Sequence, residues 1–235
     1  DPGETRIDLV NKNVELLRKI IPQIQEYVPH AIYLIVSNPV DILSYVTYKI
    51  SGKPKDEIIG SGTTLDTARF RYLLAKYCGV NARNVHAYIL GEHGDSEFAV
   101  WSSAMIGGTQ IKKYCDMCKT YNFNDCDRNF QKIFEEVKDS AYKIIERKGE
   151  TSYGIGLALS RISQAIINDE NTILPVSTLI EDFYGINDVY LSLPSIVNKN
   201  GVKEILNIDL NDEEIRNFKN SANKIKDIIK KIDLN

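Results

Sequence analysis

The chain has 235 residues, 43% of them hydrophobic and 26% charged, which is enough length and apolar content to bury a substantial core. Its 29 basic and 32 acidic residues give a formal net charge of −3, which excludes the strongly basic surface typical of nucleic-acid-binding proteins. No apolar run approaches the roughly 18 residues of a membrane span, so no membrane partner is expected. The opening residues DPGETRIDLV do not resemble a signal peptide, and the expected location is the cytoplasm.

The first part of the chain alternates helical and strand patterns. Apolar residues recur at helical spacing from Ile7 to Tyr27 and predict a first helix. Residues 31–36 read as a buried strand that stops at a Ser-Asn-Pro turn, and 40–49 as a helix. The segment EIIGSG, residues 57–62, predicts a short strand and a glycine turn, and 65–77 predicts another helix.

The middle of the chain holds two strand-like segments, 84–91 and 97–109, followed by two helical ones. The first of these helices, 129–147, is long and charged, and Gly149 ends it. The second helix is expected over 151–168.

Three later segments with turn signals between them predict antiparallel strands, namely 171–180, 188–197 and 201–208. A closing amphipathic helix, 210–232, is acidic at its start and basic at its end, as the helix dipole favours. The expected fold is α/β, with half of a parallel, Rossmann-type sheet domain in residues 1–60. An α+β domain with antiparallel strands is expected in residues 61–235.

Three of the four cysteines form a C-x2-C-x7-C pattern in a polar stretch, namely Cys115, Cys118 and Cys126. Zinc usually has four ligands, and no fourth cysteine or nearby histidine completes this set. The pattern therefore favours free thiols in a reducing compartment, and we expect no metal site.

The segment YILGEHGDSEF, residues 88–98, places His93 between two glycines and two acids. A histidine that transfers protons near pH 7 needs a carboxylate to orient its ring, and a carboxylate-bearing substrate favours an arginine as its partner. Asp66 and Arg69 lie three residues apart and share one face of the expected helix. By spacing alone, an ordinary surface ion pair and a structural histidine are the more common alternative.

Five segments, taken in chain order, match motifs of one known enzyme family: PGETRIDLV, LIVSNPVDIL, GSGTTLDTARFR, LGEHGDSEFAVWS and KGETSYGIG. Together they resemble the L-lactate dehydrogenase family, in its bacterial form, within the wider lactate/malate dehydrogenase group. The resemblance runs from Pro2 to the C-terminal helix. It implies a cytoplasmic enzyme of glycolysis and fermentation that interconverts pyruvate and L-lactate with NAD.

The resemblance also implies roles for individual residues. His93 would be the proton donor and acceptor, Asp66 its partner, and Arg69 the group that binds the substrate carboxylate. Arg6 would polarise the substrate carbonyl from a mobile loop, Asn38 would bond the reacting oxygen, and Thr151 would lie beside the substrate. The residues expected near the nicotinamide ring are Val36, Ser37, Asn38, Ser61 and Ile155.

The sequence departs from the family at its start. The glycine-rich turn of the dinucleotide site is missing, and so is the acidic residue that binds the ribose, so the chain resembles the C-terminal two-thirds of such an enzyme. The loop position that selects pyruvate over oxaloacetate would precede Asp1. GETR and SEFAVWS favour lactate over malate or another 2-hydroxy acid, and an inactive fragment is a further alternative. We expect the isolated 235 residues to be inactive and to bind NADH more weakly than millimolar.

Regulation is a further implication of the resemblance. In bacterial members, fructose 1,6-bisphosphate binds at a subunit interface, and Arg71 and His86 occupy the corresponding positions. This predicts an allosteric homotetramer. The alternative is a surface arginine and an ordinary strand histidine.

Overall fold

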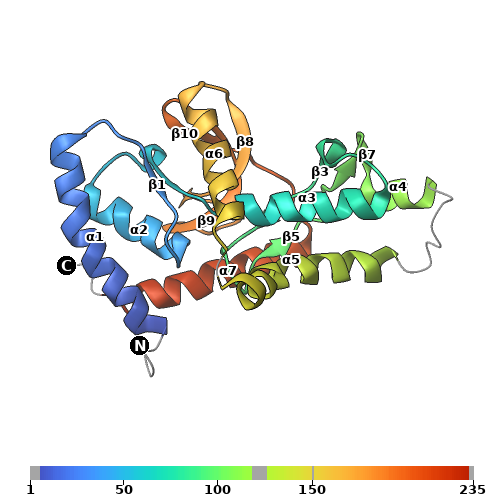
Figure 1. The fold of residues 1–235 in the computed structure, drawn as a ribbon, viewed down its shortest axis with the longest axis horizontal. Helices are drawn as coiled ribbons and strands as arrows, with labels where there is room; N and C mark the ends of the chain where they lie inside the picture. Colours follow the sequence, from blue (N-terminus) through green and yellow to red (C-terminus); the bar gives the residue numbers. More distant parts are fainter. Residues whose placement is uncertain (1–5, 118–125, 150, 233–235) are drawn as a thin grey trace.

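The computed structural model describes residues 6–117, 126–149 and 151–232 (Figure 1). Its centre is a five-stranded mixed sheet in the order β1-β2-β8-β9-β10. The strands are β1 (Tyr33–Ile35), β2 (Ile58–Gly60), β8 (Thr172–Ile180), β9 (Val189–Asn198) and β10 (Gly201–Ile205). β1 and β2 are parallel and the remaining pairs are antiparallel, which confirms the expected fold class.

The parallel and antiparallel parts meet at one point. Gly60 at the end of β2 pairs with Ser177 of β8. A Cβ atom at position 60 would lie 2.6 Å from Ser44 Oγ and 2.8 Å from Ser177 Cβ, so this close approach requires glycine. The expected domain boundary after residue 60 falls at this junction, within a continuous sheet, and the division stays a prediction.

Helices cover the sheet and build the main core. These are α1 (Arg6–Tyr27), α2 (Val40–Ser51), α3 (Thr64–Cys78), α6 (Tyr153–Ile167) and α7 (Asp212–Ile229). α1 packs on α2 through Val10 and Val14, and α7 buries Phe218 and Ala222 in the same core (Figure 1). An Asn211–Glu214 capping box starts α7, in agreement with the polar start expected for the closing helix.

A second core lies at the far end of α3, where α3 and α5 (Cys126–Lys148) run side by side (Figure 1). The short elements around it are η2 (Ala82–Asn84), β3 (Val85–His86), β4 (Ile89–Leu90), β5 (Phe98–Ala99), β6 (Met105–Ile106), β7 (Thr109–Gln110) and α4 (Ile111–Met117), whereas η1 (Lys55–Glu57) lies against β8 and β10 of the central sheet. Phe70, Ile111 and Phe130 are buried within it. This second core fixes the far half of α3 and the segment that carries His93.

One strand prediction is confirmed in more detail and another is corrected. The strand structure expected over 97–109 is present as the short strands β5, β6 and β7, and Gly107 and Gly108, with positive φ angles of 56° and 82°, form the turn between β6 and β7. The strand expected over 84–91 divides into β3, which pairs with β6, and β4, which pairs with β5. The sequence analysis also missed α4, which buries Ile111 and Cys115.

The cysteine pattern is only partly visible. Cys78 and Cys115 are free and buried. Cys126 is the first residue of α5, and Cys118 lies outside the described residues. The absence of a metal site at this pattern therefore stays a prediction. Within the described ranges, every helix is too short or too polar to cross a bilayer.

Candidate active site

The start of α3 is tied to the sheet by a glycine and a threonine. Gly62 has a φ of 53°, and a Cβ there would lie 2.5 Å from the backbone nitrogen of Ser177, so only glycine fits. The backbone N–H of Thr63 donates to Ser192 Oγ at 3.0 Å, and its hydroxyl donates to the carbonyl of Ile89 at 2.5 Å. These bonds fix the first turn of α3 against β4, β8 and β9, and Asp66 lies on this turn.

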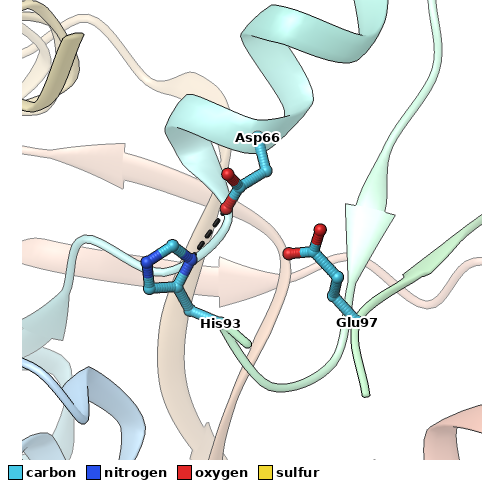
Figure 2. Close-up of side chains that lie close together, drawn as sticks. All are labelled: Asp66, His93 and Glu97. Carbon is cyan, nitrogen blue, oxygen red and sulfur yellow. Dashed lines mark hydrogen bonds and ion pairs between the residues drawn. The ribbon is translucent and has the colours of Figure 1, made fainter. Parts of the chain in front are cut away.

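Asp66 and His93 form a direct pair (Figure 2). The His93 Nδ1 atom lies 2.7 Å from Asp66 Oδ2, and Asp66 is only 5% exposed. The other oxygen, Asp66 Oδ1, lies 3.5 Å from Arg69 Nη1. With Nδ1–H donating to Asp66, the second ring nitrogen is left for another partner, and it points away from Asp66 (Figure 2).

A second carboxylate holds the backbone of His93. The N–H of His93 donates to Asp41 Oδ2 at 2.8 Å, and Ser177 Oγ donates to Asp41 Oδ1 at 2.5 Å. Asp41 is 1% exposed, and burial raises its pKa to about 6, although these hydrogen bonds oppose the shift. The sequence analysis gave Asp41 no role. The signal was an acid within the apolar run VDILSYV, since an aspartate in a buried stretch needs a partner.

The electrostatics of the site favour a protonated His93. Burial lowers the pKa of His93, but the hydrogen bond and charge of Asp66, with smaller effects of Asp41 and Glu97, raise it to about 9. The imidazolium is therefore the main form at neutral pH. A protonated ring can donate a proton to a group that approaches its free nitrogen.

A cavity of about 410 Å³ opens onto this pair. Its walls include four of the residues expected from the sequence, namely Asn38, Asp66, Arg69 and His93. One wall is α5, through Val137, Lys138, Asp139, Ala141 and Tyr142, which the sequence analysis did not foresee. Lys138 Nζ donates to the carbonyl of Asp95 at 2.8 Å and so ties α5 to the segment that carries His93.

Glu97 is the other residue that the sequence analysis missed. It lines the same cavity, and its carboxylate lies with Asp66 and His93 in a group whose potential ligand atoms are all within 4.8 Å of one another (Figure 2). Such a trio can suit a divalent cation. Here the positive Arg69 lies 3.5 Å from Asp66, and Asp66 already accepts from His93 Nδ1, so the cluster is better suited to sharing protons.

The residues expected near the nicotinamide ring lie at the carboxyl edge of the parallel strands. Val36 and Ser37 follow β1 directly, Ser61 follows β2, and the N–H of Ser61 donates to the carbonyl of Ile35 at 2.8 Å. Dinucleotides bind at this edge of a parallel sheet, so the position suits the nicotinamide end of NAD. Asn38 precedes a cis peptide bond to Pro39 and joins this edge to the cavity.

The remaining expected substrate residues are placed less directly. Thr151 precedes α6 and Ile155 lies in its first turn. A Cβ at Gly154, between them, would lie 3.7 Å from Arg69 Nη2, so this turn packs beside Arg69. Neither Thr151 nor Ile155 is among the residues that line the cavity. Arg6 begins α1, but its side chain lies outside the described part of the structure.

Two family models match the chain in succession. Residues 1–60 match the NAD binding domain of lactate/malate dehydrogenases, and residues 63–234 match their alpha/beta C-terminal domain. The chain belongs to the lactate/malate dehydrogenase family. The two matched ranges meet between the end of β2 and the start of α3.

Individual relatives within the lactate/malate dehydrogenase family are named as lactate dehydrogenases. The chain is 54% identical over 234 residues to L-lactate dehydrogenase of Acetivibrio thermocellus, which covers 99% of this chain and 72% of the relative. It is 52% identical to L-lactate dehydrogenase 1 of Clostridium acetobutylicum, over 98% of this chain and 73% of the relative.

Solved lactate dehydrogenase structures share the fold. The minor L-lactate dehydrogenase from Enterococcus mundtii, in its ligands-bound form, superposes with a TM-score of 0.93 at 40% identity, over 100% of this chain and 74% of that one. A lactate dehydrogenase from a Medee basin deep-sea metagenome library gives 0.92 at 45% identity, over 98% and 72%.

The two residues expected to bind an activator in this family lie apart from the cavity. Arg71 Nε donates to the carbonyl of Ala87 at 2.8 Å, and its guanidinium lies 4.8 Å from the centre of the Tyr88 ring. His86, on β3 beside Ala87, is exposed. Arg71 and His86 therefore belong to one region of the surface, on the side of α3 away from Arg69.

Proposed function

We propose that an enzyme built from this chain and a complete dinucleotide site interconverts pyruvate and L-lactate by hydride transfer with NAD, and that His93 is its proton donor and acceptor. The observation that carries the proposal is the Asp66–His93 hydrogen bond at 2.7 Å, in which a buried carboxylate holds a partly exposed ring, in one cavity with Arg69. The L-lactate dehydrogenases among its relatives, at 50 to 54% identity, support the substrate.

Bound NADH supplies the hydride that reduces the carbonyl carbon. As that carbon gains the hydride, negative charge develops on the carbonyl oxygen, and the free ring nitrogen of His93 donates a proton to it. Asp66 accepts from Nδ1–H, keeps the ring oriented and stabilises its positive charge. In lactate oxidation, neutral His93 takes the hydroxyl proton back.

The other residues orient the substrate. Arg69 binds the pyruvate carboxylate, because a guanidinium offers two parallel N–H groups that match the two carboxylate oxygens. Asn38 and Arg6 bond and polarise the carbonyl oxygen, and Thr151 lies beside the substrate. Val36, Ser37, Ser61 and Ile155 would contact the nicotinamide ring, which would supply the hydride to the substrate carbon.

Comparing substrates tests this function. The purified enzyme should oxidise NADH with pyruvate at a kcat/KM well above that with oxaloacetate, and His93→Gln should reduce the pyruvate rate by a factor of about 100 to 10,000. Arg83→Gln, an exposed change at η2, serves as the control and should leave the rate unchanged. A preference for oxaloacetate would make the chain a malate dehydrogenase. More than a few per cent residual rate in His93→Gln would contradict the role of His93.

Assembly, regulation and location are the finer parts of the proposal. Large apolar side chains are exposed on α1 and α6, among them Leu16, Leu157 and Ile167, and they suit subunit interfaces of a homotetramer. Fructose 1,6-bisphosphate is the proposed activator at Arg71 and His86, and the cytoplasm is the proposed location. Sedimentation with and without the bisphosphate tests assembly and activation together, and a monomer under both conditions would contradict both.

A further inference from the structure

Glu97 is a buried carboxylate whose place the proposed reaction does not explain. It immediately precedes β5, it is 7% exposed, and it lines the active-site cavity. Its side chain points toward the Asp66–His93 pair (Figure 2), and the three side chains offer atoms within 4.8 Å of one another. Glu97 therefore faces the reacting pair from the segment that leads into β5.

The other buried carboxylates of this region have hydrogen-bond donors. Asp41 accepts from Ser177 and from the His93 backbone, and Glu214 accepts from Ser102 and from the backbone of Asn211. Within the described part of the chain, no donor lies at hydrogen-bond distance from the Glu97 carboxylate. An ionised carboxylate in such a place is costly, so the group gains a proton instead.

Charges from several elements act on Glu97. Several charged side chains face this part of the cavity or the Asp66–His93 pair. They are Asp66 and Arg69 of α3, the neighbouring His93 and Asp95, Lys138 and Asp139 of α5, and Asp41 of α2. Burial and the negative charge of Asp66 raise the pKa of Glu97 well above its usual range, against smaller opposite effects of His93, Lys138 and Arg69. Glu97 therefore carries a proton at neutral pH and loses it in mildly alkaline solution.

The ionisation of Glu97 and the charge of His93 support each other. A carboxylate this close to an imidazolium favours the charged form of the ring, and Glu97 is among the groups that raise the pKa of His93. Each proton that leaves Glu97 therefore makes the proton on His93 harder to remove. At neutral pH the neutral Glu97 leaves the positive charges of His93 and Arg69 available to a carboxylate substrate.

We propose that Glu97 is a positioning residue that retains the proton on His93 as the solution becomes alkaline. It extends the pH range over which the Asp66–His93 pair protonates the pyruvate oxygen. This inference rests on the proposed function for its consequence, but the coupling between the two side chains is a property of the protein without substrate.

Nuclear magnetic resonance of ¹⁵N-histidine in the ligand-free enzyme measures the coupling directly. The His93 ring signals are identified by their loss in His93→Gln and followed through a pH titration. Glu97→Gln, which keeps the size and the neutral form, should lower the His93 midpoint by about 1 pH unit, and Glu97→Asp should retain part of the effect. Asp139→Asn is the matched control: it removes a charge from the same cavity, but its side chain is 62% exposed and solvent screens it.

Two results would overturn the inference. One is a His93 midpoint in Glu97→Gln that matches wild type, or that moves no more than in Asp139→Asn. The other concerns wild type alone, and so holds even if the variant fails to fold: the His93 titration should show a second, smaller inflection as Glu97 ionises, and a single-site curve contradicts it.

Kinetics then separate this inference from the function. In Glu97→Gln the alkaline fall of kcat/KM for pyruvate reduction should move to lower pH by the same amount as the His93 midpoint. An unmoved alkaline fall in an enzyme that still reduces pyruvate overturns the role of Glu97 alone. Failure of wild type to reduce pyruvate overturns the proposed function, while the titration still reports on the coupling.

Discussion

At the scale of single residues, the two carboxylate oxygens of Asp66 contact two different partners. One oxygen accepts from His93 at 2.7 Å and the other lies 3.5 Å from Arg69. Asp66 thus contacts both the proposed proton donor, His93, and the proposed carboxylate-binding residue, Arg69. One buried carboxylate therefore orients both His93 and Arg69. The proposed roles of the two residues differ, so a change at His93 should lower the rate and a change at Arg69 should weaken substrate binding.

Arg69→Lys tests the substrate-binding role. Lysine keeps the positive charge but loses the two parallel N–H groups, so pyruvate binding should weaken by about 2 to 4 kcal/mol. This should appear as a KM for pyruvate raised by roughly 30-fold or more, with NADH affinity nearly unchanged. Steady-state kinetics and NADH titration measure both quantities, and an equal loss of NADH binding would show that Arg69 does not act on the substrate.

At the scale of elements, the site depends on segments that the chain joins only through tertiary contacts. Asp66 and Arg69 could be paired from the sequence, because three residues of helix place them on one face. The sequence could not place α5 against the cavity, because Lys138 reaches the carbonyl of Asp95 across 43 residues of chain. His93 and Asp66 are 27 residues apart, and no local periodicity pairs them. Only the resemblance to known dehydrogenases predicted that they interact.

The errors of the sequence analysis have physical causes. The strand expected over 84–91 is divided into β3 and β4, because its two ends pair with different partners, β6 and β5. Glu97 and Asp41 were missed because an acid next to apolar residues does not reveal its partners until the chain is folded. The longer helices were well predicted, since extended amphipathic periods specify them locally, whereas the seven-residue α4 was missed.

Asp41 is the contact that joins three elements, and Asp41→Ala tests it. Alanine removes both acceptors and leaves the buried N–H of His93 without a partner, so the free energy of unfolding should fall by about 1 to 3 kcal/mol and kcat should fall with it. Asp41→Asn, which keeps one acceptor and a second polar group, should lose less of both. Equal effects of the two variants would contradict the role of these hydrogen bonds.

The contribution of Asp41 to the free energy of unfolding depends on pH with a definite sign. The pKa of Asp41 is raised from 3.8 to about 6 in the folded chain, so folding favours its protonated form. The stability that the protonated Asp41 contributes to the folded chain is fully present below pH 3.8 and is lost as the pH rises through about 6. Wild type should therefore lose stability relative to Asp41→Asn across this window, which chemical unfolding at several pH values measures.

At the scale of the whole molecule, the sheet and the second core each place part of the site, and Asp41 of α2 links the two parts through the backbone N–H of His93. The parallel strands supply the edge beside Asn38, and the second core holds α3 and α5 on either side of the cavity. This division suits the proposed hydride transfer, in which the nicotinamide would lie at the sheet edge and the acidic and basic groups would act from the α+β part. The family model of the NAD binding domain matches the part with the parallel strands, residues 1–60. The family model of the C-terminal domain matches residues 63–234.

In the proposed reaction one group, His93, donates the proton in reduction and accepts it in oxidation. The most direct test of this role is a pair of pH profiles of kcat/KM, one for pyruvate reduction and one for lactate oxidation. Since the pKa of His93 is raised from 6.5 to about 9, reduction should decline and oxidation should increase as the pH rises through one common midpoint near that value. Asp66→Asn removes the charge that favours the imidazolium and should move both limbs together to lower pH. Limbs with different midpoints, or limbs that Asp66→Asn leaves in place, would contradict the account.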